Sequence, residues 1–146
     1  MNRRNFLRTT GIVRTAVVVA PGELVVREVP VPEMGPYDAL VSIEACSLCN
    51  STDVKIIKRE FVSHIPLPLV LGHESVGTVV EVGRKVHRYE AGQRVLRPGT
   101  RYDSSQVKIA SAWGGLAEYG LVTDLAAWCA DHPGKEPGGM CAKEQV

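Results

Sequence analysis

The sequence predicts a small, mainly β protein, folded as a partly open barrel of mostly antiparallel strands with a few short helices. Three observations support this fold class. The 146 residues suit about one domain with a core of its own. Fourteen glycines and nine prolines punctuate the chain, which is typical of short strands joined by turns. Between these breaks lie short Val-rich segments, whereas amphipathic helical patterns are few.

The expected elements follow from these patterns. The Pro21-Gly22 pair is a strong turn signal and predicts a hairpin between two Val-rich strands. The segment ALVSIEAC alternates apolar and polar side chains, as a half-buried strand does. Ser51 or Thr52 is the expected N-cap of a short helix. The strands are expected at 15–20, 24–29, 39–46, 76–82, 94–96 and 117–122, the helices at 50–58, 124–132 and 140–146, and loops at 64–74 and after 96.

Composition argues against several classes of function. The net charge is +1 and no basic stripe appears, so we expect no nucleic-acid partner. No apolar run approaches the roughly 20 residues of a membrane-spanning helix, so we expect no membrane partner. The four cysteines, at positions 46, 49, 129 and 141, are too few and too irregular for a secreted disulfide scaffold. A thiol or metal role fits them better.

The first residues contain a possible export signal. The segment NRRNFLRTTG resembles a twin-arginine motif, but Arg14 interrupts the apolar stretch that should follow it. Residues 1–12 are therefore expected to be a basic extension ahead of a cytoplasmic domain. Export by the twin-arginine route is the alternative.

A cysteine and a histidine are the best candidates for chemistry. Cys49 follows the strand that ends at Cys46, and His73 follows the Pro-rich loop. Residues beyond strand ends can converge, and thiolate sulfur and imidazole nitrogen are ligands that Zn²⁺ prefers. Asp53 and Glu74 are close in sequence and could accept hydrogen bonds that orient the imidazole. Two ligands alone do not make a site, so packing or surface roles for Cys49 and His73 remain the alternative.

Other residues have simpler interpretations. Cys46 and Cys49 form a C-x-x-C pair, which suggests either a redox dithiol or half of a zinc knuckle. No second pair completes a knuckle and no βαβ pattern surrounds this one, so Cys46 is interpreted as a core thiol at a strand end. Trp113 and Trp128 are expected to be core or interface anchors rather than substrate platforms.

Several motifs resemble those of one protein family, and they follow one another along the chain in the same order as in that family. GHESVGTVVEVG is similar to the zinc signature of the medium-chain alcohol dehydrogenases, and Gly72, His73, Glu74, Gly77 and Gly83 match its fixed positions. EACSLCNSTD resembles the segment that carries the family's catalytic cysteine. YEAGQRV resembles its Gly-Asp-Arg-Val turn, with Gln93 in place of Asp, and WGGLAEYGLV is similar to its Gly-Gly-Phe-Ala-Glu-Tyr strand. The resemblance implies the GroES-like fold over residues 13–130, followed by a linker at 131–146 toward a nucleotide-binding domain absent from this sequence.

The resemblance also implies a set of site residues. Cys49 and His73 would be zinc ligands, Glu74 an alternate ligand or outer partner, and Asp53 the acceptor for the ligand histidine. A third ligand is implied near the Glu-Pro pair, with Glu136 the first candidate and Cys141 the second; a solvated loop carboxylate is the alternative for Glu136. A hydroxyl beside Cys49 would relay the alcohol proton. The stretch from Cys49 to Asp53 has one residue more than the family pattern, so counting from Cys49 selects Ser51 and counting back from Asp53 selects Thr52. Thr52 is preferred, and a helix N-cap is the alternative for either.

The activity implied is hydride transfer between an alcohol or polyol and NAD(P), with one catalytic Zn²⁺ as Lewis acid. No cysteine lies between Val95 and Trp113, where the family's structural zinc would bind, so a second zinc is not expected. The isolated chain is expected to bind zinc more readily than it oxidises alcohols, and homo-oligomers are possible. Two alternatives remain: a zinc-free relative similar to quinone reductases, and a non-enzymatic GroES-like interaction module.

Overall fold

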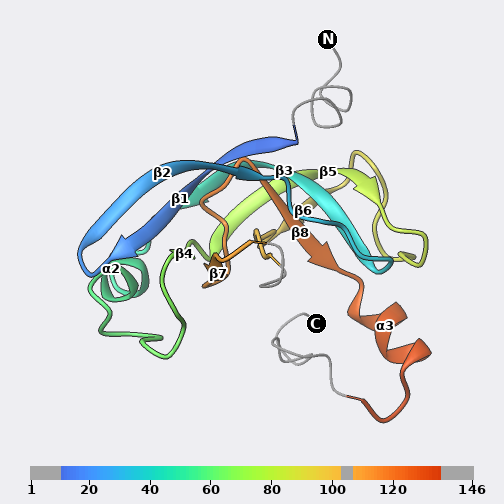
Figure 1. Cartoon of the computed structure of the whole chain (residues 1–146). Coiled ribbons are helices and arrows are strands. Elements are labelled where there is room, and N and C mark those ends of the chain that lie inside the picture. The colour runs from blue at the N-terminus through green and yellow to red at the C-terminus, as the bar shows by residue number, and fades with distance from the viewer. Residues whose placement is uncertain (1–10, 103–106, 136–146) are drawn as a thin grey trace.

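The structure is a computed structural model that describes residues 11–102 and 107–135. In this part of the chain, eight strands form two four-stranded sheets (Figure 1). The first sheet has the order β2-β1-β4-β7 and the second the order β6-β5-β3-β8. The strands of the two sheets are β1 (Ile12–Ala20), β2 (Glu23–Pro30), β3 (Asp38–Ser47), β4 (Leu69–Val70), β5 (Glu74–Val82), β6 (Arg94–Leu96), β7 (Ala110–Ser111) and β8 (Tyr119–Thr123). The predicted mainly β, partly open fold is confirmed.

The predicted hairpin is present at the start of the described chain. Strands β1 and β2 pair antiparallel around Pro21-Gly22, with Val17 opposite Val25. Gly22 has a φ of 81°, a conformation that glycine adopts without steric cost. The strands extend beyond the predicted limits on both sides, because the ladder continues to the pair Ile12 and Pro30.

Strand β3 differs from its predicted half-buried pattern. It lies between β5 and β8, and four successive residues from Ala39 to Ser42 are buried. Leu40 joins one hydrophobic cluster, whereas Ala39 and Val41 join another. Alternation is lost because the first half of this central strand is covered on both faces. Only its second half, toward Ser47, becomes exposed.

The two shortest strands lie where the sequence predicts loops. Strand β4 (Leu69–Val70) interrupts the Pro-rich segment, and β7 (Ala110–Ser111) lies in the long stretch after Leu96. They pair in parallel with each other, while β4 also pairs antiparallel with β1. A two-residue strand is too short for its sequence pattern to be recognised, and these two are defined only by the strands with which they pair.

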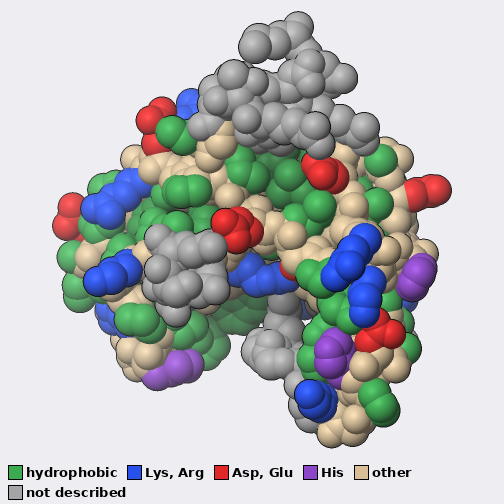
Figure 2. All heavy atoms as spheres, turned by 45° about the vertical axis from the view of Figure 1, so that its right-hand side comes forward, with side chains coloured by type: hydrophobic (Ala, Val, Ile, Leu, Met, Phe, Trp, Pro, Cys, Tyr) green, Lys and Arg blue, Asp and Glu red, His purple; other side chains and the backbone are tan. Residues whose placement is uncertain are grey.

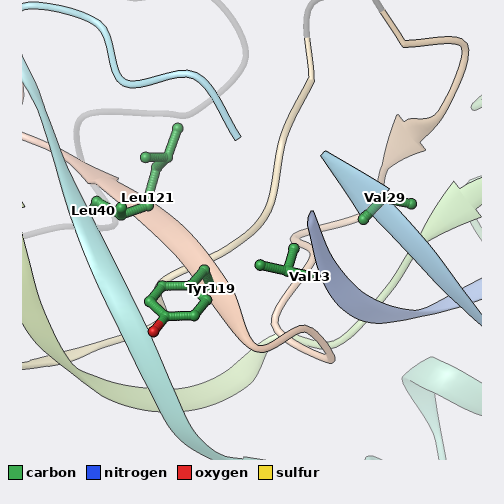
Figure 3. Close-up of a cluster of buried hydrophobic side chains, with 5 residues drawn as sticks. All are labelled: Val13, Val29, Leu40, Tyr119 and Leu121. Atoms are coloured by element: carbon green, nitrogen blue, oxygen red, sulfur yellow. The ribbon is translucent and has the colours of Figure 1, made fainter. Parts of the chain in front are cut away.

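The core joins the two sheets. Val13 and Val29 from the β1–β2 hairpin share a cluster with Leu40 of β3 and with Tyr119 and Leu121 of β8 (Figure 3). A second cluster packs helix α2 against the first sheet through Val18, Ile56, Leu69, Leu71 and Ala112. Leu71 of this cluster is two residues before His73, so the packing anchors the chain just ahead of His73.

Two short helices complete the described chain. Helix α2 spans Thr52–Ile57, and helix α3 spans Leu125–Asp131 and projects from the sheets (Figure 1). Ser51 occupies the N-cap position of α2, as one of the two predicted residues, but its side chain makes no capping hydrogen bond. Its φ and ψ of −84° and −59° are helical, which is not the extended geometry that a capping side chain needs.

Helix α3 has a cap that the sequence analysis did not single out. The side chain of Asp124 accepts hydrogen bonds from the backbone N–H groups of Ala127, His87 and Arg88 at 3.0, 2.8 and 2.8 Å. Burial raises the pKa of this carboxyl group, but the three hydrogen bonds outweigh it and hold the pKa below its ordinary value. Asp124 therefore ties α3 to the turn that follows β5.

Replacement of Asp124 by asparagine is expected to lower the free energy of unfolding by about 2 kcal/mol at pH 7, because the amide cannot accept all three bonds. Because the folded-state pKa is depressed, this contribution is nearly complete above about pH 5 and is lost as the pH falls through the folded-state value. Urea unfolding of the two proteins at pH 7 and pH 3 measures it, and the difference should shrink in acid. The exposed Asp131, on the same helix, is the control: Asp131→Asn should have a much smaller effect. An equal loss for both variants would contradict the prediction.

One face of the described surface carries charged side chains of both signs (Figure 2). Figure 2 shows Lys and Arg side chains interspersed with Asp, Glu and hydrophobic side chains on one face. Neither described helix has the length and apolar character needed to cross a membrane. The twin-arginine motif lies outside the described residues, so the cytoplasmic location and the alternative of export stay predictions.

Candidate metal centre

Three predicted ligands come together at one end of the second sheet. The register of β3 and β5 places Ser47 opposite Glu74. Cys49 lies two residues beyond Ser47 and His73 one residue before Glu74, so both leave the same edge of the sheet. One ligand atom each of Cys49, His73 and Glu74 lies within 4.8 Å of the other two. Distant parts of the sequence thus converge through strand pairing, as predicted for residues at strand ends.

Gly72 allows this convergence. Its φ is 105°, and a Cβ atom added there would lie 2.6 Å from the backbone nitrogen of Leu116. The same atom would lie 3.1 Å from the sulfur of Cys46. The backbone N–H of Leu116 donates to the carbonyl of Leu71 at 2.9 Å, so this hydrogen bond holds Leu116 in place next to Gly72. Only glycine fits at the position that turns the chain from β4 into His73.

The sulfur of Cys49 lies among hydrogen-bond donors. The backbone N–H of Thr52 donates to it at 3.4 Å. This bond, together with the Thr52 hydroxyl and the backbone of Ser51, lowers the pKa of the Cys49 thiol. The first turn of α2 therefore favours the thiolate, which is the form that binds metals. Cys49 meets the chemical requirement for a zinc ligand.

His73 lies between two carboxylates. Its Nδ1 is 3.3 Å from Oδ1 of Asp53, and its Nε2 is 3.7 Å from Oε1 of Glu74. The Nδ1 and Oδ1 atoms are buried and close, yet they are not aligned as a hydrogen bond, and neither has another partner among the described residues. Asp53 is 1% exposed and cannot turn to water. With the proton on Nδ1 facing Asp53, Nε2 is left as a lone-pair donor on the side of Glu74 and Cys49.

Asp53 also contacts the cysteine side of the cluster. Its Oδ2 accepts the backbone N–H of Cys49 at 2.8 Å. One buried carboxylate therefore contacts both the segment of Cys49 and the ring of His73. A metal bound by both Cys49 and His73 would orient the imidazole so that Nδ1 points at Oδ1 of Asp53. Such a metal would give a partner to each of these two buried atoms, which have none among the described residues. The described residues fit a zinc ion on these grounds of donor chemistry and burial.

Cys46 lies beside the cluster but outside it. Burial raises the pKa of the Cys46 thiol, with the backbone N–H of Glu74 acting in the opposite direction. Its sulfur is not among the atoms that converge with Cys49, His73 and Glu74. The two cysteines of the C-x-x-C pair therefore differ in environment: one favours the thiolate and the other the neutral thiol.

The hydroxyl candidates occupy different positions. Thr52 is partly buried and interacts with the Cys49 sulfur through both its backbone and its hydroxyl. Ser51 is exposed and its side chain makes no capping bond. The geometry therefore places Thr52 beside the candidate ligand Cys49. The other predicted ligands, Glu136 and Cys141, lie outside the described residues.

One neighbour of the site was missed by sequence reasoning. The ring centroids of Trp113 and His73 lie 5.4 Å apart, with an interplanar angle of 54°. Trp113 is 37% exposed, so it is not the core residue that its type suggests. No local pattern marks it, because its position depends on a backbone turn with a φ of 65° and on contact between distant segments.

The fold and the cluster match one family. Residues 35–133 match the alcohol dehydrogenase GroES-like domain, so this chain belongs to that family. The match includes β3, the candidate metal centre and helix α3.

Curated relatives include alcohol dehydrogenases, a sorbitol dehydrogenase and several L-threonine 3-dehydrogenases. The chain is 40% identical over 87 residues to an alcohol dehydrogenase of Cupriavidus necator, covering 60% of this chain and 23% of that one. It is 32% identical over 130 residues to mouse sorbitol dehydrogenase, covering 86% of this chain and 33% of the enzyme. The chain thus spans a third or less of the length of these relatives.

Solved structures show the same fold. A protein from Sinorhizobium meliloti 1021, assigned as a zinc-binding dehydrogenase and bound to NADP, superposes with a TM-score of 0.61. It is 33% identical, covering 77% of this chain and 36% of that one. The D-arabinose dehydrogenase of Sulfolobus solfataricus has a TM-score of 0.58 at 28% identity, covering 76% of this chain and 38% of the enzyme.

Proposed function

We propose that this chain is the catalytic domain of a zinc-dependent dehydrogenase that transfers hydride between an alcohol or polyol and NAD(P). One observation carries the proposal: Cys49, His73 and Glu74 converge beside the buried Asp53. When bound, Zn²⁺ supplies Lewis acidity at the alcohol oxygen, and NAD(P) accepts or returns the hydride. Membership of the family and the dehydrogenase relatives support this choice.

Each residue has a task that its surroundings support. The Cys49 thiolate and Nε2 of His73 would hold the metal, and the Glu74 carboxylate, which is 48% exposed, is available as a further or exchangeable ligand. Asp53 would hold the proton on Nδ1 of His73 and so keep Nε2 free as a donor. Thr52 would pass the alcohol proton toward solvent through its hydroxyl, which is already beside the Cys49 sulfur.

Metal analysis tests the metal part of the proposal. Protein dialysed against zinc and then against buffer is expected to retain about one zinc per chain, as a site with three protein ligands predicts. Folded protein that retains none would contradict it, and would favour a zinc-free reductase or a non-enzymatic module.

Replacement of Thr52 by valine is expected to slow alcohol oxidation about 100-fold, because the proton then lacks its relay, while zinc content stays unchanged. Hydride transfer is measured as reduced nicotinamide with zinc-loaded protein, NAD or NADP, and a panel of alcohols. Ser51→Ala is the matched control, since Ser51 is exposed and one residue away, and it should leave the rate nearly unchanged. If Ser51→Ala has the larger effect, Ser51 is the relay. Transfer by this chain alone is expected to be weak, because it spans a third or less of the length of its relatives, so each rate is compared with that of the zinc-free protein.

A further inference from the structure

Two partly exposed aromatic rings extend the candidate metal centre on one side. The ring of Phe61 stacks on that of Trp113 with centroids 6.5 Å apart and an interplanar angle of 15°. Trp113 in turn contacts the ring of His73 at 5.4 Å. The two side chains are 44% and 37% exposed. We call Trp113 and Phe61 the aromatic wall.

The backbone holds Trp113 in a strained conformation. Its φ is 65°, and the N–H of Gly114 donates to the carbonyl of Ala112 at 2.9 Å. This is a γ-turn with positive φ at its centre, the rare and strained form of that turn. Bulky residues rarely adopt positive φ, and Gly114 next to it has a φ of 76°.

The turn is fixed against the segment that carries His73. Ala112 donates its N–H to the carbonyl of Val70 at 2.7 Å, and Gly115 donates to the carbonyl of Gly72 at 2.7 Å. These two bonds bracket Trp113 and run to residues on the segment just before His73. The position of the indole is therefore coupled to that of the candidate ligand.

Packing alone does not account for this arrangement. A strained tryptophan in a core would be offset by burial, but this side chain keeps more than a third of its surface exposed. The other tryptophan, Trp128, lies on α3 and is partly buried, and its ring stacks on that of His132, just beyond the helix, with centroids 4.4 Å apart. Strained backbone that presents a large apolar side chain beside reactive groups is a feature of binding sites.

We propose that Trp113 is a specificity-determining residue of this site and that the aromatic wall selects alcohols with a flat apolar substituent over polyols. This inference rests on the proposed function. An aryl group beside the carbinol would stack on the indole and phenyl faces. A polyol placed there would set hydroxyl groups against ring faces that offer them no hydrogen-bond acceptor, and would lose the bonds it makes to water.

The test uses the full chain loaded with Co²⁺, whose visible absorption reports both the metal and a ligand bound at it. Benzyl alcohol and glycerol are titrated into the wild type, Trp113→Ala and Trp113→Phe. We expect Trp113→Ala to weaken the binding of benzyl alcohol roughly three- to tenfold, the range of an aromatic pair, without changing glycerol binding. Trp113→Phe should retain most of the affinity for benzyl alcohol, because a ring is kept.

A second readout does not depend on the metal spectrum. The chain has two tryptophans, so Trp128→Phe leaves Trp113 as the only one. In that variant, benzyl alcohol should change the Trp113 fluorescence with the same dissociation constant, and glycerol should not. Phe61→Ala, made in the Trp128→Phe variant, should also weaken the binding of benzyl alcohol. This second substitution keeps the test decisive if Trp113→Ala does not fold.

The outcomes separate the inference from the proposed function. Equal effects of Trp113→Ala on both alcohols, or no effect on either, would overturn the aromatic wall as a selector while Co²⁺ binding remained. Unchanged benzyl alcohol binding in Phe61→Ala would do the same. Absence of a Co²⁺–thiolate spectrum in the wild type would overturn the proposed metal site, and with it the inference.

Discussion

Replacement of Cys49 by serine is expected to weaken Zn²⁺ or Co²⁺ binding by more than about 100-fold. Removal of an outer partner of a ligand alone costs 10–100-fold, and here a ligand itself is lost. A serine hydroxyl stays protonated at neutral pH and supplies no anionic donor, whereas the hydrogen bonds from Thr52 lower the pKa of the Cys49 thiol toward the metal-binding form. Competition with a chelator of known affinity measures the loss, and the thiolate-to-cobalt absorption should vanish.

Two cysteine variants act as controls for that experiment. Cys129 lies on α3 away from the cluster, so Cys129→Ser should leave metal affinity unchanged. Cys46 lies next to the cluster but contributes no converging ligand atom, so Cys46→Ser should cost roughly tenfold or less, the lower end of the range for outer partners. If Cys46→Ser abolished binding as fully as Cys49→Ser, the metal would be held by the C-x-x-C pair instead.

Replacement of Gly72 by alanine is expected to lower the free energy of unfolding by about 4 kcal/mol. Part of this loss is the cost of a side chain at a φ of 105°, roughly 1–2 kcal/mol. The rest is overpacking, roughly 1–3 kcal/mol, because the new Cβ would lie 2.6 Å from the Leu116 nitrogen and 2.8 Å from its Cγ. Urea denaturation followed by circular dichroism measures the change. Metal affinity should fall as well, since Gly72 precedes His73.

Gly22 provides the matched control for this substitution. Its φ of 81° is also positive, but no atom lies within 4 Å of an added Cβ. Gly22→Ala should therefore show only the backbone cost of about 1–2 kcal/mol and should leave metal affinity unchanged. Similar losses for the two variants would show that the contact with Leu116 relaxes freely, and the account of the turn before His73 would be wrong.

Much of the fold was predictable from local patterns. The Pro21-Gly22 turn between Val-rich runs led to the β1–β2 hairpin, and the run from Val76 to Val82 led to β5. Both signals depend on a few neighbouring residues, so no tertiary knowledge was needed. The burial of β3 on both faces was not predictable, because it depends on the two strands that flank it.

The candidate site was likewise predictable from the sequence only in part. Cys49 and His73 were recognisable as possible ligands from residue type and from their place after predicted elements. Their approach to one another depends on the pairing of Ser47 with Glu74, a contact between distant segments. The position of Asp53 between these two candidate ligands likewise depends on the packing of the start of α2 against His73.

Residue types, turn signals and spacing were by themselves enough to define a mainly β domain and the donors for a metal. These are properties of short stretches of chain. The structure decided which donors meet and that Trp113 is held beside His73, and it supports the sequence-based preference for Thr52 over Ser51 beside the sulfur. The meeting of the donors and the place of Trp113 join residues far apart in sequence, through a strand register and a positive-φ turn that no local pattern encodes. The place of Thr52 is a local contact, and it depends on how the first turn of α2 is oriented around Cys49.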